Sequence, residues 1–252
     1  MSKPYRKAKG YWWIWLLCVF GGIAVGFTAV AQFPKDAGPW IFAVVGGPIL
    51  LGIITGAVLD RKLTKGRQKR VGAFLELLGL NFILDPEPDV KQAFFSQVQQ
   101  LEQNAALRSG GANLQWIAYG AIQGRQALIF EHMYVAGSGR TTQVQEHTAV
   151  CWVGNQPWLT LLRPRVGEGR ALERSHPELH VADERFDKNW IIWGEQAGID
   201  ILTDSFRARL ADSPRGEMWC FGGGWACCLF KYPLDPSNLA NFIQRSGNAV
   251  FL

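Results

Sequence analysis

Apolar and polar positions divide the chain into a membrane-like N-terminal part and an alternating C-terminal part. Tyr11 to Ala31 and Trp40 to Leu59 contain no charged side chain. About 20 apolar residues in a helix cross a hydrocarbon core of roughly 30 Å. The pattern therefore predicts transmembrane helices at residues 11–31 and 40–59, after a tail at residues 1–10 and joined by a turn at residues 32–39. A secretory signal peptide is disfavoured. The apolar run of a signal peptide is shorter than the first stretch here, and in this chain a second span follows directly.

The segment after the second span, residues 60–104, predicts a basic juxtamembrane stretch and two amphipathic helices. Thr64 to Leu80 has apolar residues at helical spacing. Asp85-Pro-Glu-Pro then ends the helical pattern. Asp89 is placed to cap a second helix that continues to about Asn104.

From residue 105 to 252 the pattern predicts a mostly β domain. Period-two alternation and Gly-containing turns favour an antiparallel meander, followed by further short strands and helices. The strands are expected at residues 114–122, 127–136, 141–153, 158–162, 179–182, 190–194, 218–221 and 225–231, and helices at 199–210 and 236–250. The expected fold class is a membrane α-helical hairpin plus an α+β domain with a curved antiparallel sheet of about seven strands and a C-terminal helix. A pleckstrin-homology-like half-barrel has this arrangement.

Charge changes the interpretation of the basic composition. The chain has a net charge of +5, but residues 1–70 alone contain 11 Lys/Arg against Asp36 and Asp60. Residues 71–252 hold the other 15 basic and 19 acidic residues, a net of −4. The positive charge therefore flanks the apolar stretches, where anionic lipid is the natural partner, and nucleic acid is disfavoured. Because positive flanks stay in the cytoplasm, both termini and the β domain are predicted on the cytoplasmic side of a bacterial inner membrane, with the chain as a multi-pass protein.

Small and aromatic residues in the spans predict how the hairpin packs. GxxxG spacing removes side chains from one stripe of a helix and lets two backbones approach, although glycine is common in membrane helices generally. These positions are Gly22 and Gly26 in the first span and Gly52 and Gly56 in the second. The expected membrane-interface anchors are Trp12, Trp13, Trp15, Trp40, Arg61 and Lys62. Neither span contains an acidic, basic or histidine side chain, which argues against transport through the hairpin itself.

Two sequence patterns are weak metal-site candidates. His176 and His180 are four residues apart, a spacing that can hold zinc on a helix, but Pro177 between them favours a solvated loop. Cys220, Cys227 and Cys228 supply soft ligands, but they lack a second pair to complete four. Buried small side chains are the favoured interpretation of these cysteines. We therefore expect no metal and no cofactor.

The five cysteines also bear on the compartment. They are Cys18, Cys151, Cys220, Cys227 and Cys228, an odd number that includes one residue inside a predicted span. This does not resemble a disulfide framework. Reduced thiols would fit the cytoplasm.

Acidic and histidine pairs near one hairpin are the remaining chemical candidates. Glu131 with Glu146, and His132 with His147, come close if the hairpin around residues 137–140 is regular. Paired carboxylates can perform acid–base work. Charged cross-strand pairs on a solvated sheet face are the favoured alternative, so no catalytic residue is expected.

Tryptophan is unusually frequent in the β domain. Large amphipathic rings are enriched both in cores and at interfaces. The residues Trp116, Trp158, Trp190 and Trp193 are the candidate docking aromatics, to the extent that they are exposed.

Several short motifs resemble those of uncharacterised bacterial inner-membrane proteins with an N-terminal two-helix transmembrane hairpin and a cytoplasmic β-rich domain. They are a helix end Leu78-Gly79-Leu80, a turn Gly137-Ser-Gly-Arg, a T-x-Q strand at Thr141 to Gln143 and a strand ending Leu162-Arg163-Pro164. Arg165 stands where that pattern usually has an acidic residue. The resemblance implies this architecture and a bacterial source, and no activity.

The sequence thus favours a non-enzymatic accessory or scaffold subunit of a larger inner-membrane complex, for example a photosynthetic or respiratory assembly. The expected partners are the lipid bilayer and one or more membrane proteins. A membrane-anchored module that senses a lipid or another ligand is the alternative. A membrane-tethered hydrolase that uses His176, His180 or the Glu131/Glu146 pair is the third hypothesis.

Overall fold

A computed structural model describes residues 40–97, 114–136, 143–155, 157–165, 177–211 and 217–251, together with single residues between 16 and 28. The chain divides into two compact units. One is Lys9–Arg70, and the other is Val71–Leu252 with Met1–Ala8. The larger unit contains every strand that the structure describes and is called the sheet domain below.

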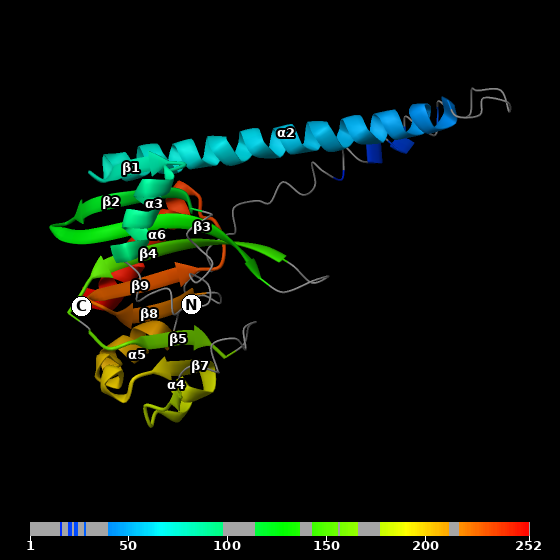
Figure 1. Ribbon diagram of the computed structural model, residues 1–252. Coiled ribbons are helices and arrows are strands. Elements are labelled where there is room, and N and C mark those ends of the chain that lie inside the picture. The colour runs from blue at the N-terminus through cyan, green and yellow to red at the C-terminus, as the bar shows by residue number, and fades with distance from the viewer. Residues whose placement is uncertain are drawn as a thin grey trace. The chain divides into compact units, whose positions relative to one another are not determined.

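Helix α2 (Trp40–Leu77) is continuous over the predicted second span and most of the next predicted helix. It is the long blue-to-cyan helix of Figure 1. It ends because Gly79 adopts a left-handed conformation with φ of +81°. Leu80 N–H donates to the Leu75 carbonyl at 3.1 Å, and Gly79 N–H donates to the Glu76 carbonyl at 2.9 Å. This pairing is a Schellman cap, so the Leu-Gly-Leu motif is the physical end of α2.

The predicted membrane spans are only partly described. Side chains of α2 are described at Gly47 and from Leu50 onward. Among the described residues, no helix is both long enough and apolar enough to cross a membrane. Most of the first predicted span lies outside the described residues.

The sheet has nine antiparallel strands in the order β1-β2-β3-β4-β9-β8-β5-β7-β6, and Figure 1 shows it as an open sheet. The strands are β1 (Asn81–Leu84), β2 (Leu114–Ile122), β3 (Arg125–Ala136), β4 (Gln143–Val153), β5 (Thr160–Pro164), β6 (Glu178–Leu179), β7 (Trp190–Gly194), β8 (Glu217–Gly222) and β9 (Trp225–Phe230).

The order of strands corrects the predicted meander. β1 to β4 follow one another, but β5 does not pair with β4. The hairpin β8–β9 lies between them, with β9 against β4 and β8 against β5. A meander would have the shortest connections between strands. However, both faces of β8 and β9 are apolar, and strands of this kind are buried best in the middle of a sheet.

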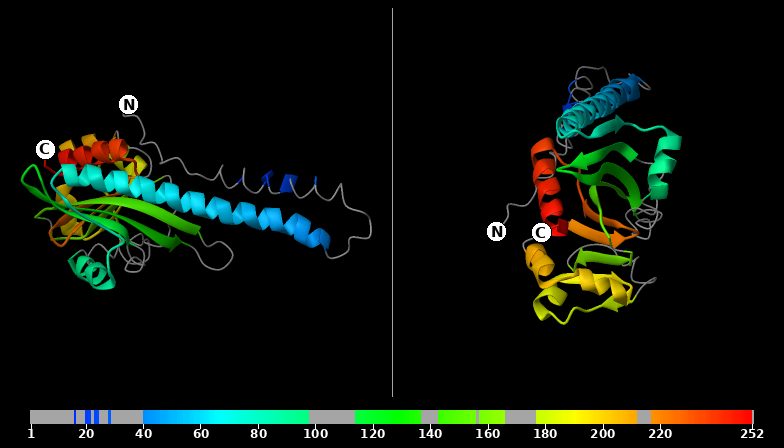
Figure 2. Two further views of the ribbon diagram at one scale, coloured as in Figure 1. Left: turned by 90° about the horizontal axis from the view of Figure 1, so that it is seen from above. Right: turned by 90° about the vertical axis from the view of Figure 1, so that its left-hand side faces the viewer.

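Helices lie on both faces of the sheet (Figure 2). They are α3 (Pro88–Gln97), α4 (Glu184–Asn189), the 3₁₀ helix η4 (Gln196–Ile201), α5 (Asp204–Ala211) and α6 (Pro236–Phe251). One core cluster joins the end of α2, α5 and α6 to side chains such as Trp152 and Phe230. A second cluster joins Phe94 of α3 to the opposite face, which includes Phe130 and Leu229. Figure 2 shows α5 and α6 together on one face and α3 on the other.

The α+β class and the C-terminal helix are confirmed, and the strand count is nine instead of about seven. The sequence pattern located β2, β3, β4, β7, β8 and β9 to within a few residues. Strand β1 and helix α4 were not predicted, because four and six residues are too short to establish a period. The predicted helix at 199–210 is divided into η4 and α5. Residues 98–104 of the predicted second amphipathic helix lie outside the described residues.

Three of the four candidate docking tryptophans are core residues. Trp116, Trp190 and Trp193 are 0%, 5% and 2% exposed. Each lies on a strand of the sheet. Their large rings therefore contribute to the core and are not available to a docking partner. Trp158 lies in the loop before β5 and is 45% exposed.

Candidate functional site

A cavity of about 340 Å³ between α5, α6 and β8 is the strongest candidate site in the described part of the chain. Its lining consists of two guanidinium groups, three amides, an indole and two aliphatic side chains. The lining residues are Arg209, Leu210, Trp219, Asn241, Gln244, Arg245, Asn248 and Ala249. A volume of this size lies at the lower end of small-molecule sites.

Helix α6 supplies five of the eight lining residues. Its apolar positions, such as Leu239, Phe242 and Ile243, are buried against the sheet. The neighbouring stripe at residues 241, 244, 245 and 248 follows the i, i+3, i+4, i+7 spacing of one helix face. The polar stripe therefore borders the core and lines the cavity.

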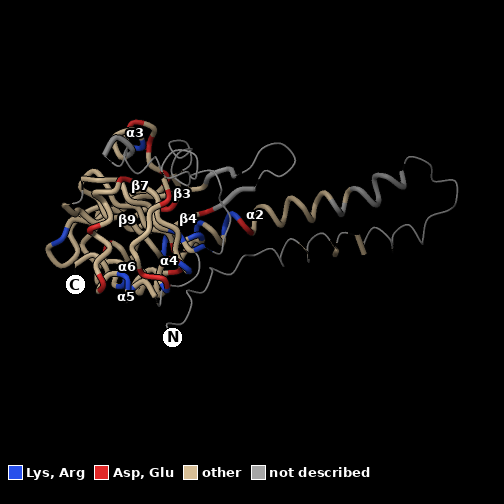
Figure 3. The backbone as a smooth tube through the Cα atoms, turned by 90° about the horizontal axis from the view of Figure 1, so that it is seen from below, with Lys and Arg blue, Asp and Glu red and all other residues tan. Residues whose placement is uncertain are grey.

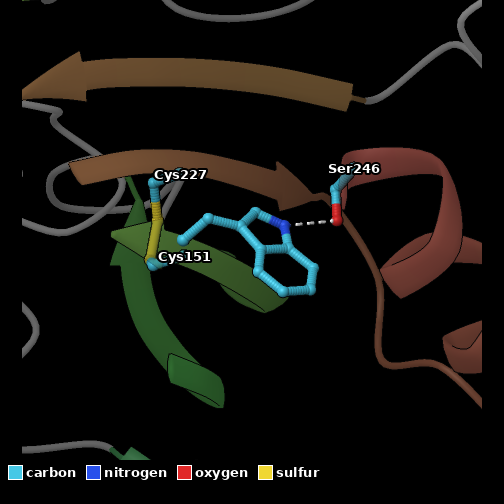
Figure 4. The surroundings of a disulfide bond; sticks show 4 residues. Cys151, Cys227 and Ser246 are labelled. Atoms are coloured by element: carbon cyan, nitrogen blue, oxygen red, sulfur yellow. Dashed lines mark hydrogen bonds between the residues drawn. A yellow bond between two sulfur atoms is a disulfide. The ribbon is translucent and has the colours of Figure 1, made fainter. Parts of the chain in front are cut away.

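A hydrogen bond fixes the rotation of α6 on the sheet. Trp152 Nε1 donates to Ser246 Oγ at 3.0 Å, and Ser246 Oγ donates to the Ile243 carbonyl at 3.0 Å. Figure 4 shows the first of these bonds reaching Ser246 on the helix. Both groups are buried, so losing either partner would leave an unsatisfied polar atom.

Arg245 is tied to a buried carboxylate on the sheet. Its Nε lies 3.5 Å from Oε1 of Glu217, which is 1% exposed and lies on β8. Burial raises the pKa of the Cys228 thiol well above its usual value, and the negative charge of Glu217 raises it further. Arg245 opposes that increase, which is consistent with a Glu217–Arg245 ion pair at the edge of the core.

Arg209 and Trp219 have unused hydrogen-bonding capacity beside the cavity. Arg209 Nη2 donates to the Ala249 carbonyl at 3.2 Å, while its buried Nε has no hydrogen-bond acceptor among the described residues. The buried Trp219 Nε1 likewise has no acceptor there. No described carboxylate forms an ion pair with Arg209. A cation without a carboxylate partner among the described residues, together with the amides of α6, is the chemical feature of this site.

A second cavity of about 250 Å³ lies against α4 and α5, and structural contacts occupy its charged groups. Asp183 caps α4 by accepting from Phe186 N–H at 3.1 Å. That backbone bond, more than its side-chain bond with Arg207, holds the pKa of the carboxyl below its usual value. Arg207 also binds the Leu202 carbonyl and Asp204. These contacts join α4 to α5 and occupy three of the four charged side chains that line this cavity, namely Asp183, Asp204 and Arg207.

Two histidines form a buried pair on the α3 face of the sheet. His132 on β3 and His147 on β4 are register partners, and their rings stack with centroids 5.5 Å apart. They are 0% and 1% exposed. Burial, together with the charges of His132 and Lys231, lowers the pKa of His147 to about 3. His147 is therefore neutral near pH 7, as a packing residue requires.

A disulfide joins Cys151 of β4 to Cys227 of β9, and Figure 4 shows it bridging the two strands. This corrects the expectation of reduced thiols, because register brings two cysteines 76 residues apart into direct opposition. Cys220 on β8 is the register partner of Cys227 on its other side, and Cys220 and Cys228 are free and buried. Disulfides persist in oxidising compartments, so the bond favours an extracytoplasmic sheet domain over the predicted cytoplasmic one.

The predicted acid–base pairs are differently placed from expectation. Glu131 pairs in register with Thr148, and Glu146 with Met133, so the two glutamates are diagonal neighbours. Glu131 is 1% exposed, so it does not lie on a solvated face. Neither of the two cavities is lined by Glu131 or Glu146.

The weak zinc candidates are only partly described. His176 lies outside the described residues, and His180 is exposed, with Nδ1 3.8 Å from Asp187 Oδ2. Among the residues that the structure describes, no group of three or more His, Cys, Asp or Glu is placed to hold a metal ion.

Most predicted hairpin residues are not described in detail. Gly22, Gly26, Trp12, Trp13 and Trp15 lie outside the described residues. Trp40 begins α2, but its side chain is not described. In α2, Gly52 is half-buried and Gly56 is buried, whereas Arg61 and Lys62 are exposed. The predicted packing stripe and interface anchors therefore stay predictions.

Reasoning from the sequence missed Arg209, Arg245 and the polar stripe of α6. The stripe was visible as Asn241, Gln244, Arg245 and Asn248 at helical spacing. A polar stripe on an amphipathic helix usually faces solvent. This one lines a cavity only because α5 lies beside α6.

The chain was compared with known proteins at three levels. No protein-family model matches it, and no curated protein matches it. Among solved structures it is similar to the crystal structure of the mycobacterial trehalose monomycolate transport factor A, TtfA, with a TM-score of 0.47 and 12% identity. That similarity covers 74% of this chain and 95% of TtfA.

We expect the stability of the protein to fall in acid because of His147. In the unfolded chain a histidine has a pKa near 6.5, whereas folded His147 has a pKa of about 3. Between these values the unfolded state binds a proton that the folded state does not, so the free energy of unfolding falls as pH falls, by about 1.4 kcal/mol per pH unit. Urea unfolding at pH 7, 6, 5 and 4 measures this slope.

His147→Gln should remove this part of the pH dependence between pH 6 and 4, because glutamine does not titrate. The matched control is His180→Gln, which replaces an exposed histidine. An identical slope in the wild-type chain and in His147→Gln would contradict the prediction.

We expect the Cys151–Cys227 bond to survive denaturation without reductant. Differential alkylation with mass spectrometry should find Cys220 and Cys228 as thiols and the other pair linked. Replacing Cys151 and Cys227 together by serine should lower the free energy of unfolding by up to about 4 kcal/mol, the value for a closed loop of this length. Cys220→Ala is the control that leaves the bond intact.

The same measurement on intact cells reports the compartment. A disulfide in cells quenched with a membrane-permeant alkylating reagent means an oxidising, extracytoplasmic location. Two alkylated thiols at Cys151 and Cys227 would mean the cytoplasmic side that the charge pattern predicts.

Proposed function

We propose that this chain is a membrane-anchored, non-enzymatic accessory protein that presents its sheet domain to a larger bacterial inner-membrane complex, for example a photosynthetic or respiratory assembly. The observation that carries the proposal is a run of exposed apolar side chains on α2, followed by basic ones. The apolar residues are Leu50, Leu51, Ile53, Ile54, Val58 and Leu59, which are 38% to 68% exposed.

Such a run is unfavourable in water. Exposed contiguous apolar surface is typical of a membrane or protein contact, and each buried leucine or isoleucine contributes roughly 1.5–3 kcal/mol. A bilayer is the favoured environment, because Trp40 to Leu59 contains no charge and the preceding stretch, Tyr11 to Ala31, is equally uncharged. The two-span hairpin is thus proposed as the anchor.

Basic side chains follow the apolar run directly. Arg61, Lys62, Lys65, Lys69 and Arg70 are exposed on α2, where Figure 3 marks them in blue. Each lysine or arginine close to an anionic membrane surface contributes about 1 kcal/mol. This arrangement supports an anchor that ends at a lipid head-group layer.

The paired polar groups of the sheet domain support a role without catalysis. Glu217 pairs with Arg245, Asp183 pairs with Arg207, and His132 stacks on His147. All three arrangements hold elements together. They supply no nucleophile beside a base in either cavity, which leaves the membrane-tethered hydrolase without support from the described residues.

Trp158 is the favoured docking residue on the sheet domain. It is 45% exposed in the loop between β4 and β5, whereas the other candidate docking tryptophans are buried. Exposed tryptophan is over-represented among residues that dominate binding energy at protein interfaces. We propose this loop as part of the contact with the partner complex.

A ligand-sensing module is the second candidate function, because the α5–α6 cavity has a cationic and amide lining. The two functions are compatible, since the cavity lies within the sheet domain and the apolar run lies outside it.

We expect charged substitutions in the apolar run to release the protein from the membrane. An arginine near the centre of a span costs about 2.5–3.5 kcal/mol, so Leu51→Arg with Ile54→Arg should shift the chain out of the carbonate-resistant membrane fraction. Leu77→Arg is the matched control, because Leu77 is also exposed on α2, at 87%, but lies beyond the anchor. Equal membrane retention of both variants would rule out this anchor.

We expect the full chain, purified in a mild detergent, to elute with one defined partner at a fixed ratio. Trp158→Ala should weaken that complex at least tenfold, while Tyr119→Ala, which removes a similarly exposed aromatic ring, should not. Quantitative mass spectrometry after size-exclusion chromatography measures the ratio. A monodisperse monomer would contradict the accessory role.

A further inference from the structure

We propose that the α5–α6 cavity is a binding site for a phosphate group, with Arg209 as its main charged ligand. The site lies within the sheet domain and does not depend on the proposed accessory role. Its lining residues come from strand β8 and from helices α5 and α6, and both helices lie on one face of the sheet (Figure 2).

The charge of the cavity favours an anion. Arg245 is balanced by Glu217, whose Oε1 lies 3.5 Å from Arg245 Nε. Arg209 has no described acidic partner, and it lies on α5 with a half-buried side chain. A guanidinium that is partly removed from water without a counter-ion is unfavourable. A bound anion would supply the missing charge.

The hydrogen-bonding groups favour an oxyanion with several acceptor oxygens. Arg209 lines the cavity, and its guanidinium group carries several N–H donors. The amides of Asn241, Gln244 and Asn248 add further donors around the same cavity. Guanidinium groups match the geometry of phosphate, and neutral N–H groups complete such sites without adding charge.

The held position of Arg209 makes this an organised site. Its Nη2 donates to the Ala249 carbonyl near the end of α6, at 3.2 Å, so the guanidinium is fixed between the two helices. Fixed donors lose little freedom on binding, which favours affinity.

The phosphate group can come from a soluble molecule or from a phospholipid head group, and titration of the full chain in detergent distinguishes the two. One arm uses inorganic phosphate, with chloride at equal ionic strength as the reference. The other arm uses nanodiscs that contain phosphatidylglycerol or phosphatidylcholine. We expect a rise in the melting temperature and saturable calorimetric binding in at least one arm.

Two variants test the assignment. Arg209→Gln should weaken the binding at least tenfold, because it removes the guanidinium charge. Asn241→Asp, on an exposed position of the lining, places a negative charge there and should weaken it as well, even if Arg209→Gln proves unstable. Arg185→Gln is the control, since Arg185 lines the other cavity and should leave the affinity unchanged.

Saturable phosphate binding that is lost in Arg209→Gln and Asn241→Asp supports the site, and the arm in which it occurs identifies the source. Binding that is equal in all variants would place the anion elsewhere and overturn the proposal. Absence of binding in both arms with a folded wild-type chain would overturn it too.

Discussion

The pairing of β4 with β9 is the interaction on which the sheet domain depends. Six register pairs, from Thr148 with Phe230 to Val153 with Trp225, join the N-terminal meander to the C-terminal half. Both core clusters cross this seam, so its loss would open each of them. The pairing is non-local and carries a large loop-closure entropy, which slows formation of the seam. The Cys151–Cys227 disulfide and the Trp152–Ser246 hydrogen bond reinforce it from the two faces.

The candidate site inherits its geometry from that seam. Helix α6 lies over β4 through Trp152 and over β8 through the Glu217–Arg245 ion pair. A buried ion pair adds little net stability, but it specifies where the helix can lie, since any shift leaves a buried charge unpaired. The polar stripe of α6 is thereby held beside Arg209 of α5. Core packing and the cavity lining are thus parts of one arrangement.

Two physical signals in this chain concern its compartment, and they favour opposite sides of a membrane. The basic residues that flank the apolar stretches favour a cytoplasmic sheet domain, because positive flanks resist translocation. The disulfide favours an oxidising compartment, because cytoplasmic reductants keep thiols reduced. Burial also contributes: Cys220 and Cys228, buried beside the bond, have a raised pKa and are therefore poor nucleophiles for exchange. The redox state of Cys151 in cells is for this reason the most informative property of the domain.

The sequence by itself determined the elements whose period is local: the uncharged stretches, the alternating strands such as Leu114–Ile122, the amphipathic α6 and the glycine that ends α2. Local period depends on backbone geometry within a few residues, so it can be recognised without knowing the fold. Only the tertiary structure decided that β8–β9 enters between β4 and β5, that Cys151 faces Cys227, and that Trp116 and Trp193 are buried. It also brought Arg209 beside the stripe of α6. These features depend on which distant segments pair, and pairing is set by the burial of whole faces, which no local pattern encodes.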